Sequence, residues 1–355
     1  MGSLRFFLAL SVIFAHVGTF SGFSLGDGRL AVQTFFMISG FYMSLVWFEK
    51  YSKLQSPIRT FYISRALRIY PMYFIVLAIA LLMGVLARSS NPAFHFFDAV
   101  SALGWPTALW AYLTQITLIG METPLFLNFE LHNYMVLPVA WTLGLELTFY
   151  LLVPFLLPRL SVVVGMLFLL LIVRALAFMS GPSLDAELNN NLWSYRFFPF
   201  ELALFLAGAL AQRVFAGLPN KVTMMIEKPG VYFLAVLAMI GGLCYYTLLR
   251  PQLGEATYWL YYAMAFIGVA LLFQHTKTSK RDTYIGELSY PMYISHLPVL
   301  WAVASFCKPE NRIYIVIPAT LLVSMLLSRM QEFVDNYRHV LVRRAQAKFS
   351  HAIQK

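Results

Sequence analysis

Ten long apolar segments constrain this chain more than any other feature of its sequence. A helix needs about 20 apolar residues to cross a hydrocarbon core of about 30 Å, and each segment is close to that length. They lie at about 4–20, 31–48, 70–87, 138–157, 161–179, 197–214, 231–249, 258–274, 286–305 and 313–330. The pattern predicts an all-α polytopic membrane protein with about ten transmembrane helices.

The charged residues support a membrane protein and argue against a nucleic-acid-binding protein. Only 12% of the residues are charged and 60% are apolar, yet the net charge is +10. The basic residues fall between the apolar segments and form no single polar face, so we expect no nucleic-acid binding. With both termini cytoplasmic, 19 of the 26 Lys and Arg residues lie on the inner side, as the positive-inside rule requires.

An eleventh segment, 98–120, is interrupted by Gly104, Pro106 and Gln115. If it also crossed, the basic C-terminal end would face outward, so we expect a re-entrant or interfacial segment. Residues 1–332 are predicted to form one membrane domain and residues 333–355 a basic cytoplasmic tail. A signal peptide is the alternative for residues 4–20, but a further apolar segment follows at once and we predict a retained span.

The first span carries two polar groups that an apolar helix does not need, Arg5 and His16. Eleven helical residues turn through three turns and roughly 20° and rise about 16 Å, so both side chains share one face. An Arg at the inner interface then places the His near the bilayer midplane. The imidazole suits proton abstraction from a hydroxyl near neutral pH, and the alternative is a packing role.

Glu146 reaches a similar depth from the outer side and is expected to act catalytically with His16. A structural role as partner of Arg174 or of another buried cation is the alternative. Cys244 and Cys307 stand far apart without a CxxC motif, so neither a disulfide framework nor a metal site is expected.

The first inner loop holds Arg65 and Arg68, three residues apart and so on one helical face. With Arg5 they are predicted to form a cationic cluster for a phosphate-rich donor, on whose base Tyr62 or Tyr70 stacks. The alternative is that the two arginines only set the orientation of the chain in the membrane, as the positive-inside rule describes.

A third set of residues is expected to line the same cavity as His16 and Glu146. His296 lies near mid-depth in the penultimate span, although a structural partner is the alternative for a His flanked by Tyr and Ser. The expected cavity-lining residues are Ser39, Tyr150, Tyr290 and His296.

Five motifs occur in a fixed order along the chain. They are Arg5 with ten residues before His16, FFMISGF at Phe35–Phe41, RALRIYPMY at Arg65–Tyr73, WTLGLELTFY at Trp141–Tyr150 and ELSYPMYISH at Glu287–His296. With these motifs the sequence resembles the membrane acyltransferase 3 family over about residues 2–330. Ala31 differs from the Gly that such sequences often have, and no esterase-like SGNH domain follows, so we expect transfer by this chain alone or with a partner.

The resemblance implies a ten-span bundle in a bacterial inner (plasma) membrane that takes acyl-CoA from the cytoplasm. It implies that His16 is catalytic and that Arg5, Arg65 and Arg68 serve donor binding or catalysis. We therefore expect an acetyl-CoA-dependent O-acetyltransferase acting on a surface or lipid-linked carbohydrate, with His16 as general base or transient acyl carrier and without a metal. A proton-coupled transporter or flippase is the alternative, although no inverted repeat is evident.

Overall fold

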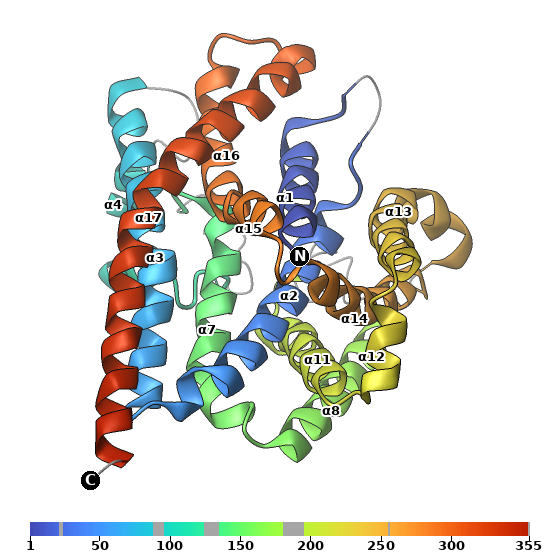
Figure 1. Ribbon diagram of the computed structural model, residues 1–355. Helices are drawn as coiled ribbons and strands as arrows, with labels where there is room; N and C mark the ends of the chain where they lie inside the picture. The colour runs from blue at the N-terminus through green and yellow to red at the C-terminus, as the bar shows by residue number, and fades with distance from the viewer. Residues whose placement is uncertain (21–23, 88–95, 124–134, 180–194, 255, 354–355) are drawn as a thin grey trace. The chain divides into compact units, whose positions relative to one another are not determined.

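The computed structural model describes the whole chain except residues 21–23, 88–95, 124–134, 180–194, 255 and 354–355. Within this part the chain forms helices and no strands (Figure 1), which confirms the predicted all-α fold. The helices are α1 (Gly2–Val17), α2 (Gly28–Glu49), α3 (Pro57–Ala87), α4 (Phe96–Ser101), α5 (Trp105–Thr117), α7 (Trp141–Leu156), α8 (Leu160–Met179), α11 (Phe198–Ala216), α12 (Asn220–Ile226), α13 (Pro229–Leu253), α14 (Ala256–Thr276), α15 (Lys280–Glu287), α16 (Ser289–Ala304) and α17 (Arg312–Ile353). Short 3-10 turns lie at Tyr51–Lys53, Pro138–Ala140 and Pro309–Asn311.

Every predicted span coincides with a helix. In the described part, seven helices are long and apolar enough to cross a membrane, which makes this an integral membrane protein. They are Gly28–Lys53, Pro57–Leu86, Pro138–Leu156, Phe198–Ala216, Pro229–Tyr246, Ala256–Thr276 and Pro309–Gln346. The apolar helices Gly2–Val17 and Leu160–Leu176 are shorter, and α16 has 16 residues. The count of ten spans and the cytoplasmic placement of both termini stay predictions.

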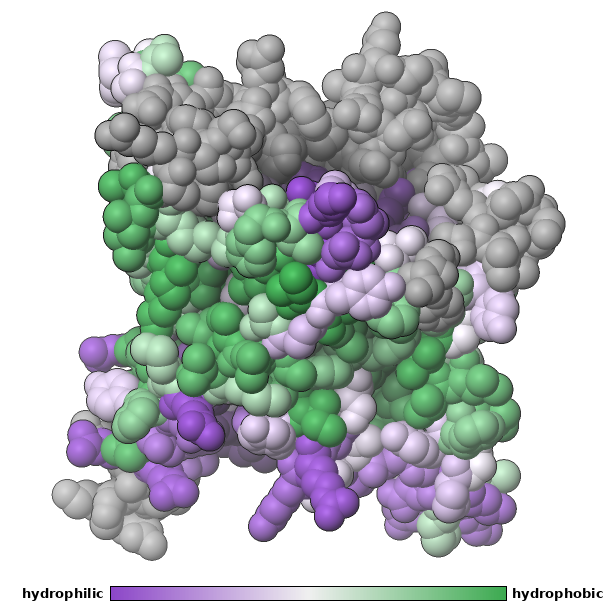
Figure 2. Space-filling model, turned by 90° about the horizontal axis from the view of Figure 1, so that it is seen from above, coloured by the Kyte–Doolittle hydropathy of each residue, from purple (hydrophilic) through white to green (hydrophobic). Residues whose placement is uncertain are grey.

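Several helices expose large apolar side chains. Examples are Phe168 and Leu169 on α8 and Leu322 and Leu326 on α17. Apolar side chains also cover broad areas of the face that Figure 2 shows. A protein in water would bury such surfaces, whereas lipid tails solvate them.

The chain divides into two compact units. The first unit comprises Met1–Ser52 and Leu152–Tyr290, and its most extensive helix contact joins α2 to α11. A side chain at Gly40 would overlap the backbone of Phe205, and one at Gly208 would overlap the backbone of Met37. The two glycines therefore let the helix backbones touch, as small residues do in membrane bundles.

The second unit comprises Lys53–Leu151 and Pro291–Lys355. Its helices α3 and α17 lie side by side (Figure 1). The helix α17 continues without a break past residue 332, where the sequence predicts the start of a tail. That domain boundary stays a prediction.

The interrupted segment 98–120 also lies in the second unit. It forms parts of two helices, because α4 ends at Ser101 and α5 begins after Gly104 with Pro106 in its first turn. The helix α5 has 13 residues, about 20 Å, and ends at Leu118 with φ 63°. A helix of this length does not cross a core of about 30 Å. Its re-entrant or interfacial position stays a prediction.

Candidate active site

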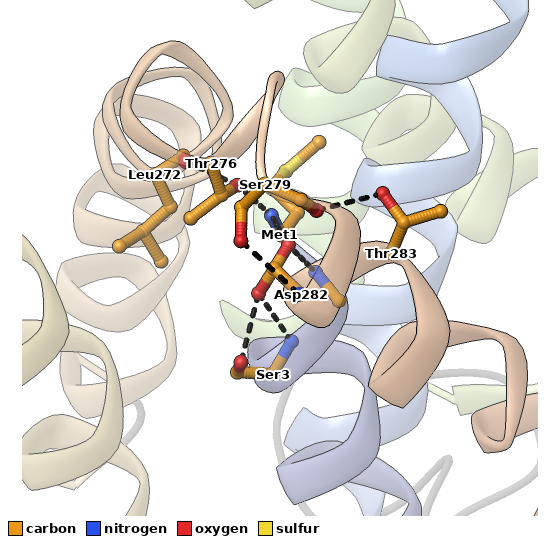
Figure 3. A network of polar contacts seen from close by, with 8 residues as sticks. Met1, Ser3, Leu272, Thr276, Ser279, Asp282 and Thr283 are labelled. Carbon is orange, nitrogen blue, oxygen red and sulfur yellow. Dashed lines mark hydrogen bonds and ion pairs between the residues drawn. The ribbon is translucent and has the colours of Figure 1, made fainter.

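The start of α1 is held by a carboxylate from another helix. Asp282 of α15 accepts hydrogen bonds from the backbone N–H of Gly2 (2.6 Å) and of Ser3 (2.8 Å), and from Ser3 Oγ (2.8 Å). The Met1 amine donates to the same carboxylate at 2.8 Å and also to Thr276 Oγ1 (Figure 3). Asp282 thereby satisfies N–H groups that the first turn of a helix leaves without a partner.

This capping changes the acidity of the carboxyl group. Burial alone would raise the pKa of Asp282, but the hydrogen bonds from the Met1 amine and from the backbone of Ser3 and Gly2 outweigh burial. They hold the pKa of Asp282 well below its usual range. The carboxylate is therefore charged wherever the protein is studied near neutral pH.

Arg5 lies one turn further along α1. Its guanidinium carbon is 5.6 Å from the centre of the Tyr42 ring on α2. A Cβ built on Gly286 would lie 2.5 Å from the backbone Cα of Gly2 and 2.5 Å from Arg5 Nη2, so glycine at this position lets the start of α1 pack against α15. Arg5 is therefore enclosed by α2 and α15 within the first unit.

His16 stands in the last turn of α1, and its side chain is exposed. Its Nδ1 is 2.9 Å from the carbonyl oxygen of Val12, four residues back. In the neutral imidazole this contact requires the proton on Nδ1, which leaves the basic lone pair on Nε2. The helix ends one residue later, where Gly18 adopts φ 116°.

The beginning of α2 packs beside this end of α1. A Cβ built on Gly28 would lie 2.6 Å from Ala15 Cβ, and Ser11 Oγ donates to the carbonyl of Leu25 at 2.7 Å. The Asp27 carboxylate caps α2 by accepting from two backbone N–H groups. The guanidinium of Arg196 also interacts electrostatically with His16. Glycine at position 28 thus lets the start of α2 meet the helix turn that holds the histidine.

A buried polar network continues along α2 and was not predicted as a site. Arg174 lies 3.7 Å from Glu201, and both side chains are fully buried. Gln33 Nε2 donates to Glu201 at 2.9 Å, and Tyr262 donates to Gln33 Oε1 at 2.6 Å. Within the first unit, the ion-pair partner of Arg174 is Glu201. The alternative that pairs Arg174 with Glu146 of the second unit stays a prediction. The sequence signal was present, since Arg, Gln and Glu within apolar spans are rare.

The second unit brings two predicted residues together around Tyr150. The Arg65 guanidinium is 6.0 Å from the ring centre of Tyr150 and 5.9 Å from that of Phe61. The Tyr150 hydroxyl donates to Glu146 Oε1, one turn back on α7. Arg65, Tyr150 and Glu146 therefore form a continuous set in which the ring lies between cation and carboxylate.

The other two predicted donor-binding residues of α3 make separate contacts. Arg68 Nη1 is 3.3 Å from the Asp335 carboxylate on α17. The Tyr70 hydroxyl donates to the carbonyl of Thr117 at 2.6 Å, and its ring stacks on Phe74. Arg68 thus faces α17 while Arg65 faces α7, so the two do not share one set of contacts.

The predicted cavity-lining residues differ in exposure. His296 is fully buried, with Nδ1 2.6 Å from the carbonyl oxygen of Tyr293. Ser39 and Tyr290 are half-buried. Because Arg5 and His16 belong to one unit and Arg65, Arg68 and Glu146 to the other, the predicted meetings between these sets stay predictions. Among the described residues, no group of three or more His, Cys, Asp and Glu could hold a metal ion.

Comparison with known proteins places this geometry in a family. A family model described as an acyltransferase domain matches residues 2–329. The O-acetyltransferase OatA of Staphylococcus aureus (strain NCTC 8325 / PS 47) is 24% identical over 94% of this chain and 56% of that protein, so the chain spans about half its length. An uncharacterized protein of Aquifex aeolicus (strain VF5) is 21% identical over 58% of this chain and 91% of that protein. No solved structure matches the chain significantly. Because the family model covers nearly the whole sequence, the chain belongs to the acyltransferase 3 family.

Proposed function

We propose that this protein is an integral membrane O-acyltransferase of the bacterial inner membrane. In this proposal it moves an acetyl group from cytoplasmic acetyl-CoA to a hydroxyl of a surface or lipid-linked carbohydrate. Membership of an acyltransferase family supports the reaction class. The relative named O-acetyltransferase OatA supports an oxygen acceptor and an acetyl group. The observation that carries the proposal is the geometry of His16, an exposed imidazole whose Nδ1 is engaged by the backbone.

The end of α1 supports a site within the membrane. If Arg5 lies at the inner interface, His16 lies about 16 Å deeper, and α1 ends one residue after it. Backbone that leaves a helix at that depth is tolerated where it is enclosed by protein or lines a water-filled cavity. A polar acceptor needs such a cavity to reach the histidine.

Two routes use His16 Nε2. In the direct route, Nε2 takes the proton of the acceptor hydroxyl as its oxygen attacks the thioester carbonyl, and coenzyme A leaves as a thiolate that regains the proton. In the carrier route, Nε2 first attacks the thioester and displaces coenzyme A. The acceptor oxygen then attacks the acyl-imidazolium, the neutral ring leaves, and the hydroxyl proton passes to the coenzyme A thiolate. Both routes develop an oxyanion, which needs a hydrogen-bond donor within about 3 Å. Arg5 lies about 16 Å from His16 along α1 and is proposed to bind the acyl donor.

Arg65 is the proposed donor-binding residue with the clearest setting. Its guanidinium lies over two aromatic rings, and a stacked guanidinium still offers its edge to phosphate oxygens. Glu146 joins the same set through Tyr150 and is proposed to stabilise the imidazolium of His16. Arg68 and Tyr70 are proposed to border the donor while keeping their contacts to Asp335 and Thr117.

The test uses purified protein in detergent with acetyl-CoA labelled in the acetyl group. Release of coenzyme A together with an alkali-labile acetyl ester on a carbohydrate supports the proposal. His16→Ala should abolish ester formation, whereas His275→Ala should not, because His275 Nε2 contacts the Ile226 carbonyl in another part of the unit. A transporter would leave the donor intact. Label retained on denatured wild-type protein and absent from His16→Ala would select the carrier route.

A further inference from the structure

Arg29 is a half-buried cation that the proposed reaction does not use. It follows the Asp27 cap in the first turn of α2, next to Gly28, which touches Ala15 of α1. Arg29 therefore lies near the end of α1 that carries His16.

The guanidinium is framed by aromatic rings. Its carbon lies 4.5 Å from the ring centre of Tyr258 and 5.6 Å from that of Tyr195, and Nη1 donates to the Tyr258 hydroxyl at 3.3 Å. The guanidinium of Arg196 lies 5.8 Å from the same Tyr195 ring and interacts electrostatically with His16. Two guanidinium groups thus share one tyrosine beside the proposed base.

Two carboxylates act on the guanidinium of Arg29. The charged groups that act on Arg29 include Asp27 and Glu201. Asp27 accepts the backbone N–H groups of its helix, and Glu201 is 3.7 Å from Arg174. Both carboxylates therefore also serve groups other than Arg29.

Buried hydrogen bonds one helix turn beyond Arg29 and Tyr258 hold the two helices that carry them. Gln33 lies one turn beyond Arg29 on α2, and Tyr262 lies one turn beyond Tyr258 on α14. Gln33 and Tyr262 bond to each other, and both join the Arg174–Glu201 pair. A binding group is most effective when buried hydrogen bonds fix the elements that carry it.

We propose that Arg29, with Arg196, binds an anionic group of the acceptor carbohydrate, a carboxylate or phosphate, and so places the neighbouring hydroxyl at His16. This rests on the function proposed above. Arginine suits the task because its planar fork donates two parallel hydrogen bonds to such anions while its face stacks on a ring.

The test compares sugars that differ in charge, using thermal shift of the purified full chain. Methyl glucuronide and methyl glucoside differ by a carboxylate, and glucose 1-phosphate supplies the phosphate. Wild type should bind at least one anionic sugar about tenfold more tightly than methyl glucoside, the value of one charge-assisted contact. The sugar that is preferred identifies the anion, and inorganic phosphate tests whether the sugar is needed.

Three variants separate binding from structural roles. Arg29→Gln should remove the preference for charged sugars, and Arg29→Lys should keep part of it because the charge remains. Arg213→Gln is the matched control, since Arg213 also lies over a ring in this unit, Phe48 at 4.1 Å, and should keep the full preference. Equal binding of charged and neutral sugars by wild type, or an unchanged preference in Arg29→Gln, would overturn the proposal. If Arg29→Gln fails to fold, Arg196→Gln decides: it should weaken the preference for the charged sugar, and an unchanged preference in that variant would overturn the proposal.

His16→Ala distinguishes failure of this inference from failure of the proposed function. It should retain the preference for the charged sugar and lose acetyl transfer. If wild type prefers the charged sugar but transfers no acetyl group to it from acetyl-CoA, both the proposed reaction and the role of that sugar as acceptor are rejected. Transfer that is insensitive to acceptor charge would reject the role of Arg29 alone.

Discussion

Two histidines, His16 and His296, have the same local hydrogen bond and opposite access. Nδ1 of each contacts a carbonyl of the preceding turn, at 2.9 Å from Val12 and 2.6 Å from Tyr293. Both neutral rings therefore carry the lone pair on Nε2. His296 is fully buried, whereas His16 is exposed in the last turn of its helix.

The difference shows that the tautomer alone does not make a general base. A base must come within about 3 Å of the proton it removes, so the substrate must reach Nε2. A buried imidazole with a satisfied Nδ1 contributes to packing and to the polar balance of its unit. Removal of the His16 ring should therefore lower catalytic activity, whereas removal of the His296 ring should lower stability.

His16→Ala should give the largest effect on catalysis. Loss of the base or acyl carrier should lower kcat by about 10²–10⁴-fold, the usual contribution of a general base. Thermal stability should change little because the side chain is exposed. The measurement is ester formation from labelled acetyl-CoA, with His275→Ala as control. Activity within about twofold of wild type would remove His16 from the mechanism.

Glu146→Gln tests whether the accessible histidine has a carboxylate partner. If Glu146 stabilises the imidazolium, the change should lower kcat by about 10–10²-fold. In the double variant with His16→Ala, the glutamine change should add little, because residues acting as one unit are not additive. Tyr150→Phe is the local control, since it removes the hydroxyl that bonds to Glu146 and keeps the carboxylate. Full additivity in the double variant would separate Glu146 from His16.

His296→Ala should act on stability. Removing a fully buried ring leaves a cavity and frees a carbonyl, at a cost of about 2 kcal/mol in unfolding free energy. The folded fraction should keep kcat within a few-fold of wild type. Thermal unfolding in detergent, together with activity per folded molecule, checks both statements. A loss of kcat as large as that of His16→Ala would show that His296 reaches the substrate.

The helical spans could be predicted from the sequence because hydropathy is a local property. All ten apolar segments coincide with helices, and Gly104 and Pro106 correctly mark the break before α5. The end of α1 was harder to place, since the expected span reached residue 20 and the helix ends at Val17. Apolar residues continue past the end, so hydropathy does not mark it.

Side-chain partners depend on tertiary packing, which periodicity does not reveal. Arg65 and Arg68 share a sequence motif, but one meets Tyr150 and the other Asp335, 267 residues away. The network of Glu201 joins four helices. The sequence does not predict these contacts, because each polar residue stands alone in its own span. Asp282 reads as an ordinary residue of a basic loop, and its role at the start of α1 emerges only in the folded unit.

The smallest expected effect concerns Asp282, which holds the helix of the accessible histidine and not that of the buried one. Asp282→Asn should cost about 1 kcal/mol of stability at pH 7, as loss of a helix cap does. The pKa of Asp282 is held below the unfolded value of about 3.9, so its stabilising effect is present above that pH and is lost as the pH falls toward the folded pKa. The difference in Tm between wild type and Asp282→Asn should therefore be constant from about pH 5 up to the pH at which the Met1 amine, whose pKa is lowered by burial, loses its proton. It should shrink on acidification below about pH 4. Glu227→Gln, which alters an exposed ion pair with Lys277 at 3.7 Å, should leave Tm nearly unchanged. A Tm difference for Asp282→Asn that grows on acidification would show that the carboxylate does not stabilise this end of α1.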